Sequence, residues 1–209
     1  MIKVHHLNSS RSHRILWMLE ELELPYEIVA YQRDPVTRLA PPSLKAIHPL
    51  GKSPVITDGD RVVAESGAII EYLAKGPGGG RLWPRDGSAN WVEHAHWMHF
   101  AEGSAMLPLM LALYTSRLGA AAAPLQPRIE SEIANHLGYM EGALADRPYF
   151  AGQDFTAADI QLSFILEGAD ASDRLASYSR LRDILARYRA RPAYARAIAK
   201  GGPLALTRR

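Results

Sequence analysis

Residues 48–73, HPLGKSPVITDGDRVVAESGAIIEYL, decide the fold of this chain. Two short β-branched runs at 55–57 and 61–64 flank the turn signal Asp58-Gly59-Asp60, a pattern that predicts a β-hairpin. Glu65-Ser66-Gly67 then precedes apolar residues at helical spacing. A helix is therefore expected here, with an acidic residue and a hydroxyl at its N-terminus.

Two features of this stretch predict a binding site for a small peptide. In Ser53-Pro54-Val55 a proline stands at the entry to a strand, where a cis peptide bond is tolerated. Such a bond would turn the Val55 backbone outward to pair with an extended peptide. At Glu65-Ser66 the positive end of a helix dipole attracts a carboxylate, and Glu65 is placed to hold an ammonium group beside it. Together they would bind the head of an amino acid.

The order HPLGKSPVI…ESGAIIEYL resembles the glutathione-binding half of the glutathione transferase superfamily, whose N-terminal domain has the thioredoxin fold. The resemblance implies that Val55 pairs with the cysteinyl backbone of glutathione. It also implies that Glu65 and Ser66 receive the γ-glutamyl group and that Lys52 reaches the glycyl carboxylate. The implied glutathione-binding residues are Lys52, Ser53, Pro54, Val55, Glu65 and Ser66. Glutathione is then a co-substrate, and no metal is expected.

The pattern upstream of this stretch completes a first domain. In chain order the expected elements are a strand at 2–7, a helix at 14–24, a strand at 26–31, a short helix at 42–47, the hairpin and the helix after it. This βαβ–ββα order is what a thioredoxin-like α/β domain requires.

A cluster of helix breakers at 75–84 marks a change of character. We expect a glutathione-binding domain at 1–76, a linker at 77–87 and an all-helical domain at 88–209. The expected helices of the second domain are 89–117, 125–145, 156–166 and 175–200.

Length and composition agree with this division. The chain has 209 residues, of which 47% are hydrophobic and 22% charged, and a net charge of +2 that gives no electrostatic argument for binding nucleic acid. It has no cysteine, which excludes disulfides, cysteine-ligated metals and catalysis by a thiol of the protein. The first residues lead directly into a strand without a signal peptide or membrane span, so a cytoplasmic protein is expected. Several arginines near the C-terminus follow the polar side of an amphipathic helix and are expected on a solvated face: Arg180, Arg182, Arg187, Arg189, Arg191 and Arg196.

The loop Asn8-Ser9-Ser10 is the second chemical signal. It lies between a strand and a helix start, where hydroxyls stand beside free N–H groups and can stabilise an anion. The family places its catalytic residue in this loop, and the serine-type resemblance implies Ser9, six positions before Ile15. Ser10 and then Asn8 are the alternatives, and both serines acting only as helix caps is a further interpretation.

Three groups of residues in the second domain need assignment. Phe155-Thr156-Ala157-Ala158-Asp159 predicts a capping box, which gives Asp159 a role in folding and not in catalysis. His94, His96 and His99 lack the i, i+4 spacing and the carboxylate of a zinc site. His99, Gly103 and Met106 share a helical face that is expected to border Ser9 and to line a pocket for the electrophile. The segment around Gly103 resembles the bacterial and fungal GTT-like subgroup of the family.

The resemblance implies a glutathione transferase, in which the glutathione thiolate attacks a hydrophobic electrophile, and a homodimer. A glutathione-dependent peroxidase or disulfide reductase is one alternative, with the redox chemistry carried by glutathione. A non-catalytic interaction or carrier module is another. Neither a nucleic acid nor a membrane is expected as a partner.

Overall fold

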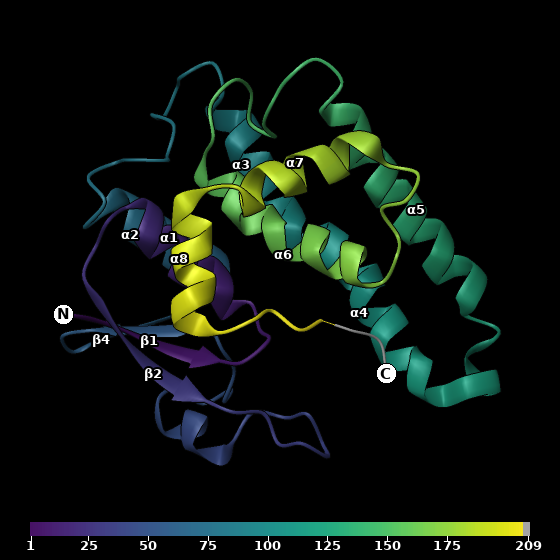
Figure 1. The fold of residues 1–209 in the computed structure, drawn as a ribbon, viewed down its shortest axis with the longest axis horizontal. Helices are drawn as coiled ribbons and strands as arrows, with labels where there is room; N and C mark the ends of the chain where they lie inside the picture. The colour runs from purple at the N-terminus through teal and green to yellow at the C-terminus, as the bar shows by residue number, and fades with distance from the viewer. Residues whose placement is uncertain (207–209) are drawn as a thin grey trace. The chain divides into compact units, whose positions relative to one another are not determined.

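The computed structural model describes residues 1–206, which form two compact units (Figure 1). The first unit contains residues 1–84 and 188–206, and the second contains residues 85–187. The thioredoxin-like domain and the helical domain expected from the sequence are both present.

A four-stranded sheet of order β2-β1-β3-β4 forms the centre of the first unit. Its elements are β1 (Ile2–Leu7), α1 (Ser12–Glu21), β2 (Tyr26–Tyr31), the 3-10 helix η1 (Pro42–Ala46), β3 (Val55–Asp58), β4 (Arg61–Ala64) and α2 (Ser66–Lys75). β1 and β2 are parallel and joined through α1, whereas β3 and β4 run antiparallel. Val4 pairs with Ile28 on one side and Ile56 on the other, and both Val4 and Ile56 are fully buried. The predicted βαβ–ββα order is confirmed.

The single helix expected over 175–200 is wrong. The structure has α7 (Ser179–Arg189) and α8 (Pro192–Gly201), separated at Arg191, whose backbone is extended (φ −72°, ψ 131°). The break follows from Pro192, because proline has no N–H to donate within a helix and disfavours helical backbone in the residue before it. α8 lies against α1 (Figure 1), so residues 188–206 complete the first unit instead of the second. Residues 207–209 of the expected helical domain lie outside the described residues.

Aromatic side chains fill the contact between α1 and the returning segment. The Trp17 side chain is 1% exposed, and its ring centroid lies 5.4 Å from that of Tyr188 and 5.2 Å from that of Tyr194. The Trp17–Tyr194 pair is edge-to-face, an arrangement that aromatic rings favour.

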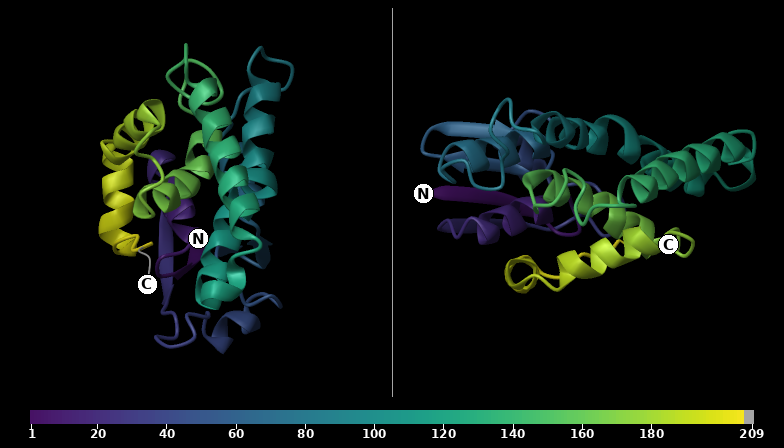
Figure 2. Two further views of the ribbon diagram at one scale, coloured as in Figure 1. Left: turned by 90° about the vertical axis from the view of Figure 1, so that its right-hand side faces the viewer. Right: turned by 90° about the horizontal axis from the view of Figure 1, so that it is seen from above.

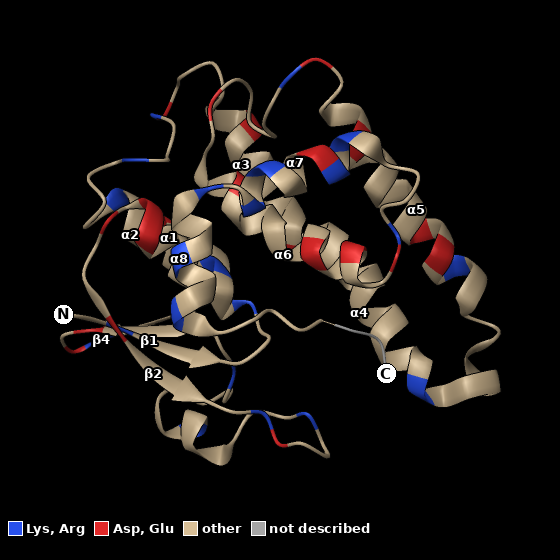
Figure 3. Ribbon diagram, in the orientation of Figure 1, with Lys and Arg blue, Asp and Glu red and all other residues tan. Residues whose placement is uncertain are grey.

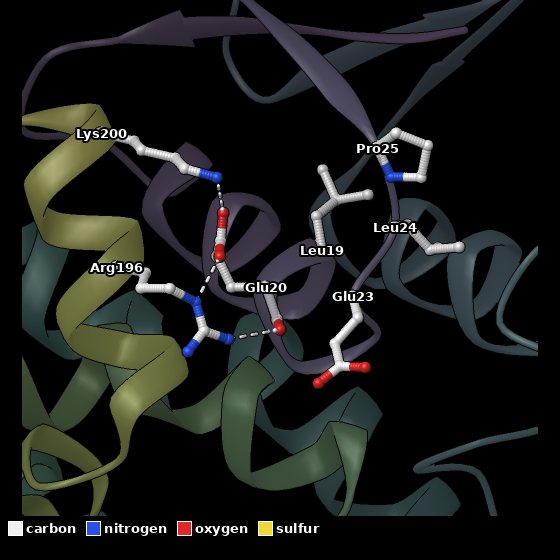
Figure 4. Close-up of a pocket in the computed structure, with 7 residues that line it drawn as sticks. All are labelled: Leu19, Glu20, Glu23, Leu24, Pro25, Arg196 and Lys200. Carbon is white, nitrogen blue, oxygen red and sulfur yellow. Dashed lines mark hydrogen bonds and ion pairs between the residues drawn. The ribbon is translucent and has the colours of Figure 1, made fainter.

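Two neighbouring carboxylates of α1, Glu20 and Glu21, bind basic residues of α8 and of the position before it. Figure 3 colours the basic residues along α8 blue. Arg191 donates to both oxygens of Glu21, at 2.6 and 2.8 Å. Glu20 accepts from Arg196 at 2.7 Å and from Lys200, beside an open pocket on the surface (Figure 4). Arg196 is 47% exposed, as the expected solvated face implies, whereas Arg191 is only 29% exposed. Both arginines also fasten the α8 segment to α1, a role that the sequence did not indicate.

The second unit is helical, as expected. Its elements are α3 (Trp91–Phe100), the π-helix η2 (Ala101–Ala105), α4 (Met106–Thr115), the 3-10 helix η3 (Ser116–Ala122), α5 (Gln126–Ala143), α6 (Ala157–Ala171) and most of α7. α4 and α5 run side by side (Figure 2). The capping box at the start of α6 is confirmed: the Thr156 N–H donates to Asp159 Oδ2 at 2.8 Å, and the Asp159 side chain is fully buried.

Among the described residues, the stretch Trp91–Ala122 is long and apolar enough to cross a membrane by length and composition alone. Core helices of soluble proteins pass the same test, so the stretch carries no membrane assignment.

Candidate active site

The sheet register brings three chain segments to one edge of the first unit. β1 ends at Leu7, β3 begins at Val55 opposite His5, and β4 ends at Ala64, which also pairs with Val55. Neighbouring strands lie about 4.8 Å apart. The loop after β1, the segment before β3 and the start of α2 are therefore close neighbours in space.

Two helices begin at this edge, α1 at Ser12 and α2 at Ser66. Their unpaired N–H groups and positive dipole ends favour a negative charge there. The chain places a binding segment, a hydroxyl loop and two helix starts within one small region.

The peptide bond between Ser53 and Pro54 is cis, the form that the sequence analysis considered at this proline. Val55, however, does not turn its backbone outward: it is 1% exposed and sits in the sheet between His5 and Ala64. That expectation is wrong, because a central strand commits its polar backbone groups to its neighbours. Ser53 is half-buried, and its backbone N–H and carbonyl have no partner among residues 1–206. Its hydroxyl donates to the His5 carbonyl at 2.8 Å, which holds the segment against β1.

Glu65 and Ser66 stand at the start of α2 as expected. Glu65 is exposed and has φ +70°, a left-handed backbone conformation that a glutamate adopts only at a cost of about 1–3 kcal/mol. Ser66 follows it at the first helical position and is 5% exposed. Lys52 is exposed on the segment before Ser53, and no ion pair holds it within the described chain. A strained acidic residue beside a helix start is a feature of functional sites.

Two of the three side chains in the loop after β1 are committed to structural contacts. Asn8 Oδ1 accepts from the Arg33 backbone N–H at 2.8 Å, so this amide holds the connection after β2. Ser10 is 3% exposed; its Oγ accepts from the Ser12 N–H at 3.2 Å and lies 2.7 Å from the Ser12 Oγ. Ser10 thus acts as a cap for α1.

Ser9 is different from its two neighbours. It is half-buried, it has φ +48°, and its Oγ accepts a hydrogen bond from the Ala205 backbone N–H at 3.2 Å. Its own hydroxyl proton has no acceptor among the described residues, which leaves it available to a bound ligand.

A buried histidine fixes the direction of the hydrogen bonds behind this loop. Burial lowers the pKa of His6, although its hydrogen bond to Gly201 raises it, so the ring is neutral at pH 7. His6 Nε2 lies 2.8 Å from the Gly201 carbonyl, which can only accept, so Nε2 carries the proton. His6 Nδ1 then accepts from the Ser12 hydroxyl at 2.8 Å, and Ser12 in turn accepts from Ser10. The Ser10 proton is thereby used within the protein.

His13 packs edge-to-face on His6, with ring centroids 4.9 Å apart. Burial lowers the pKa of His13 to about 4, and the neighbouring His6 adds to this effect. Both rings are therefore uncharged at neutral pH.

In the second unit the structure separates one of the three residues predicted to border the electrophile. His99 and Gly103 are exposed, and a Cβ at Gly103 would meet open space. Met106 is 5% exposed and faces the core. The reason is the π turn of η2 between them, because one extra residue rotates the following helix by about 100°. The expectation of one shared face is wrong for Met106.

The three histidines of α3 also diverge. His94 is 2% exposed, the His96 Nε2 lies 3.1 Å from the Tyr139 hydroxyl, and His99 is exposed. Across residues 1–206 no three potential ligands gather into a group that could hold a metal ion.

Sequence reasoning missed two participants in the site, His6 and Ala205. His6 reads as part of a strand, and Ala205 lies far from Ser9 in sequence. The Gly201-Gly202-Pro203 sequence was the available signal, since it marks a change of direction after α8.

Comparison with known proteins agrees with this geometry. The family model of the glutathione S-transferase N-terminal domain matches residues 1–75, and that of the C-terminal domain matches residues 123–196. Glutathione S-transferase 3 of Schizosaccharomyces pombe is 39% identical over 178 residues, covering 78% of this chain and 72% of the relative.

Solved structures give the same result. A glutathione S-transferase from Actinobacillus pleuropneumoniae superposes with a TM-score of 0.91 at 33% identity and covers 100% of this chain and 97% of its own. A glutathione transferase family member from Pseudomonas fluorescens, solved with two glutathione bound, has a TM-score of 0.79 at 27% identity, covering 94% of this chain and 92% of its own. The chain therefore belongs to the glutathione S-transferase family of enzymes.

Proposed function

We propose that this enzyme is a glutathione transferase that ionises the thiol of glutathione at the Ser9 hydroxyl and presents the thiolate to a hydrophobic electrophile. The proposal rests on the different hydrogen bonds that the three side chains make in the loop after β1. Asn8 holds Arg33 and Ser10 caps α1, whereas the Ser9 proton is unused within the described residues.

The size of the required effect fits this chemistry. A free thiol has a pKa near 8.5, so only a few per cent is thiolate at pH 7. Lowering that pKa by about 2 units takes roughly 2.7 kcal/mol of differential stabilisation. A hydrogen bond to an anion contributes about 1.5–3 kcal/mol and a helix N-terminus about 0.3–1 kcal/mol. One hydroxyl and the helix starts are enough together.

For glutathione binding we propose a revised assignment. The free backbone of Ser53, in place of that of Val55, pairs with the cysteinyl backbone, because Val55 is committed to the sheet. Glu65 and Ser66 receive the γ-glutamyl head, and Lys52 reaches the glycyl carboxylate. The Pseudomonas relative solved with two glutathione bound supports glutathione as the ligand.

The test is a pH titration of the thiolate absorbance of glutathione bound to the enzyme, repeated with Ser9→Ala and with Ser10→Ala. We expect a lowered thiol pKa that returns toward 8.5 in Ser9→Ala. Ser10→Ala removes a helix cap, so it should lower the melting temperature and leave the thiol pKa in place.

A reversal of the two variants would make Ser10 the catalytic residue and refute the assignment. Glutathione that binds with an unshifted pKa would refute thiol activation and favour a carrier or interaction module. Turnover with hydroperoxides or disulfides, but not with aryl or alkyl halides, would favour the peroxidase or reductase reaction.

For the electrophile, we propose that the exposed surface at His99 and Gly103 sets the preference. The space beside Gly103 makes its substitution informative. Gly103→Val should change the KM for the electrophile and leave the pKa of bound glutathione unchanged. A changed thiol pKa would argue against this role.

We further propose a homodimer, formed through α4. Leu107, Leu111 and Tyr114 recur at i, i+4 and i+7 and are 58%, 40% and 60% exposed. A two-fold axis brings the same surface patch of two copies together, so this apolar stripe would pack against its own copy. The stripe therefore favours a second copy of this chain as the partner. Leu107→Glu should give a monomer in sedimentation velocity, whereas Leu125→Glu, exposed but outside the stripe, should not. A wild-type monomer would refute the dimer.

A cytoplasmic location remains the expectation from the sequence.

A further inference from the structure

The segment that follows α8 is held against β1 and α1 by a contact that only glycine permits. The Gly201 carbonyl accepts from His6 Nε2 at 2.8 Å. A Cβ on Gly201 would lie 2.4 Å from Leu16 Cδ1 and 3.3 Å from the His6 ring. Both neighbours are buried, so neither can move aside freely. The backbone at Gly201 therefore packs directly against His6 and Leu16, with no room for a side chain between them.

The next residues turn this segment onto the loop itself. Gly202 has φ +79° and ψ 175°, a conformation that is open to glycine and strained for other residues. Pro203 follows and limits the flexibility of the chain. Two residues later the Ala205 N–H donates to Ser9 Oγ at 3.2 Å. Residues 202–206 will be called the tail.

We propose that the tail is a working part of the thiol-activating site, with the Ala205 amide as the group that positions the Ser9 hydroxyl. This inference rests on the proposed role of Ser9. A hydroxyl offers one donor and two acceptor positions. The Ala205 N–H occupies an acceptor position of Ser9, which restricts rotation of the hydroxyl and leaves its proton for the glutathione sulfur.

The same hydrogen bond strengthens Ser9 as a donor. A hydroxyl that accepts a hydrogen bond is polarised and donates more strongly, by about 10–30%. Ala205 is a positioning residue, because it acts on the thiolate through Ser9. Since the contribution comes from a backbone N–H, the side chain at position 205 matters little.

His6 connects the tail to the other side of the loop. Its Nε2–H donates a hydrogen bond to the Gly201 carbonyl, and its Nδ1 accepts one from the Ser12 hydroxyl. The Ser12 hydroxyl in turn accepts a hydrogen bond from the Ser10 hydroxyl. Ser9 and Ser10 are therefore both fixed by the segment that ends α8, one directly and one through His6. This arrangement explains why Ser9 alone retains a free proton.

The test removes the Ala205 N–H and compares the result with two control variants in which this N–H is present. Ala205→Pro deletes the donor, Ala205→Gly retains it, and Leu206→Pro places a proline in the tail while leaving the Ala205 N–H intact. We expect Ala205→Pro to raise the pKa of bound glutathione by about half a unit and to lower kcat at pH 6.5. The KM for glutathione should stay at the wild-type value in Ala205→Pro. In Ala205→Gly and Leu206→Pro the pKa of bound glutathione should stay at the wild-type value. In the Ser9→Ala background, Ala205→Pro should have no further effect on the thiol pKa.

Each result separates the tail from the proposed function. If Ser9→Ala leaves the thiol pKa unchanged, the role of Ser9 itself fails. If Ser9→Ala raises the pKa but Ala205→Pro matches Ala205→Gly, only the role of the tail is overturned. An increase of kcat in Ala205→Pro would show that the tail obstructs the site, and it would equally overturn the proposal.

Discussion

Glu20→Gln tests how firmly α8 is bound to α1. The Glu20 side chain is 7% exposed and accepts from the Tyr26 hydroxyl at 2.7 Å, from Arg196 at 2.7 Å and from Lys200. Burial raises the pKa of this carboxyl, but the hydrogen bonds from Lys200, Tyr26 and Arg196 together lower it by more. The pKa of Glu20 is therefore below its ordinary value. Glutamine keeps the shape, loses the charge and turns one acceptor into a donor that faces another donor.

The expected loss of stability follows from these contacts. A hydrogen bond to a charged group contributes about 1.5–3 kcal/mol. Arg196 and Lys200 are 47% and 52% exposed, so water replaces part of what they lose. We therefore expect the free energy of unfolding to fall by about 2 kcal/mol in all, equivalent to a melting temperature roughly 4–8 °C lower.

Urea unfolding at pH 7 measures this difference, with Glu27→Gln as the matched control. Glu27 forms an exposed pair with Lys3 at 3.6 Å, so its substitution should cost under about 0.5 kcal/mol. Because the folded-state pKa of Glu20 is lowered, its contribution is present above the unfolded pKa and is lost as the pH falls through the folded value. Equal effects of the two substitutions at pH 7 would refute the reasoning.

Two further predictions concern buried polar groups. His13 has a folded pKa of about 4 against 6.5 when free, so the unfolded chain takes up a proton between pH 6.5 and 4 that the folded chain does not. Stability should therefore fall on acidification through this window, and His13→Phe should remove a slope of up to about 1.4 kcal/mol per pH unit in urea unfolding; an unchanged slope would contradict the burial of a neutral ring. Asp159→Ala leaves the N–H groups of Phe150 and Thr156 and the Thr156 hydroxyl without their acceptor, and should lower the free energy of unfolding by about 3 kcal/mol. Calorimetry measures this loss. If the pKa of glutathione bound to the folded variant equals that of the wild type, Asp159 serves folding and not thiol activation.

The first unit was predictable because its signals are local. The β-branched runs around Asp58-Gly59-Asp60 and the helical spacing after Glu65 each depend on neighbours within a few residues. The proline at the entry to β3 likewise marked the position where a cis bond could occur, and the Ser53–Pro54 bond is cis. The fate of the Val55 backbone was not, because it depends on strands that pair from both sides.

The errors in the helices have separate physical causes. Pro192 marked the break between α7 and α8 in the sequence, but the apolar spacing on both sides of it suggested one helix. The π turn at 101–105 left no pattern of its own, and it rotated Met106 into the core. The contact of Ser9 with Ala205 joins residues 196 positions apart, and no local rule reaches that distance.

The return of residues 188–206 to the first unit has a consequence for the order of events during synthesis. Chains generally fold domain by domain as they leave the ribosome, the N-terminal part first. Here residues 1–84 emerge with the α1 surface around Trp17 and Glu20 still uncovered, and its covering helix is translated only after the whole second unit. The thioredoxin-like unit therefore begins folding first and finishes last. Until α8 arrives, an aromatic surface and two carboxylates of the nascent chain stay open to water and to any chaperone that binds them.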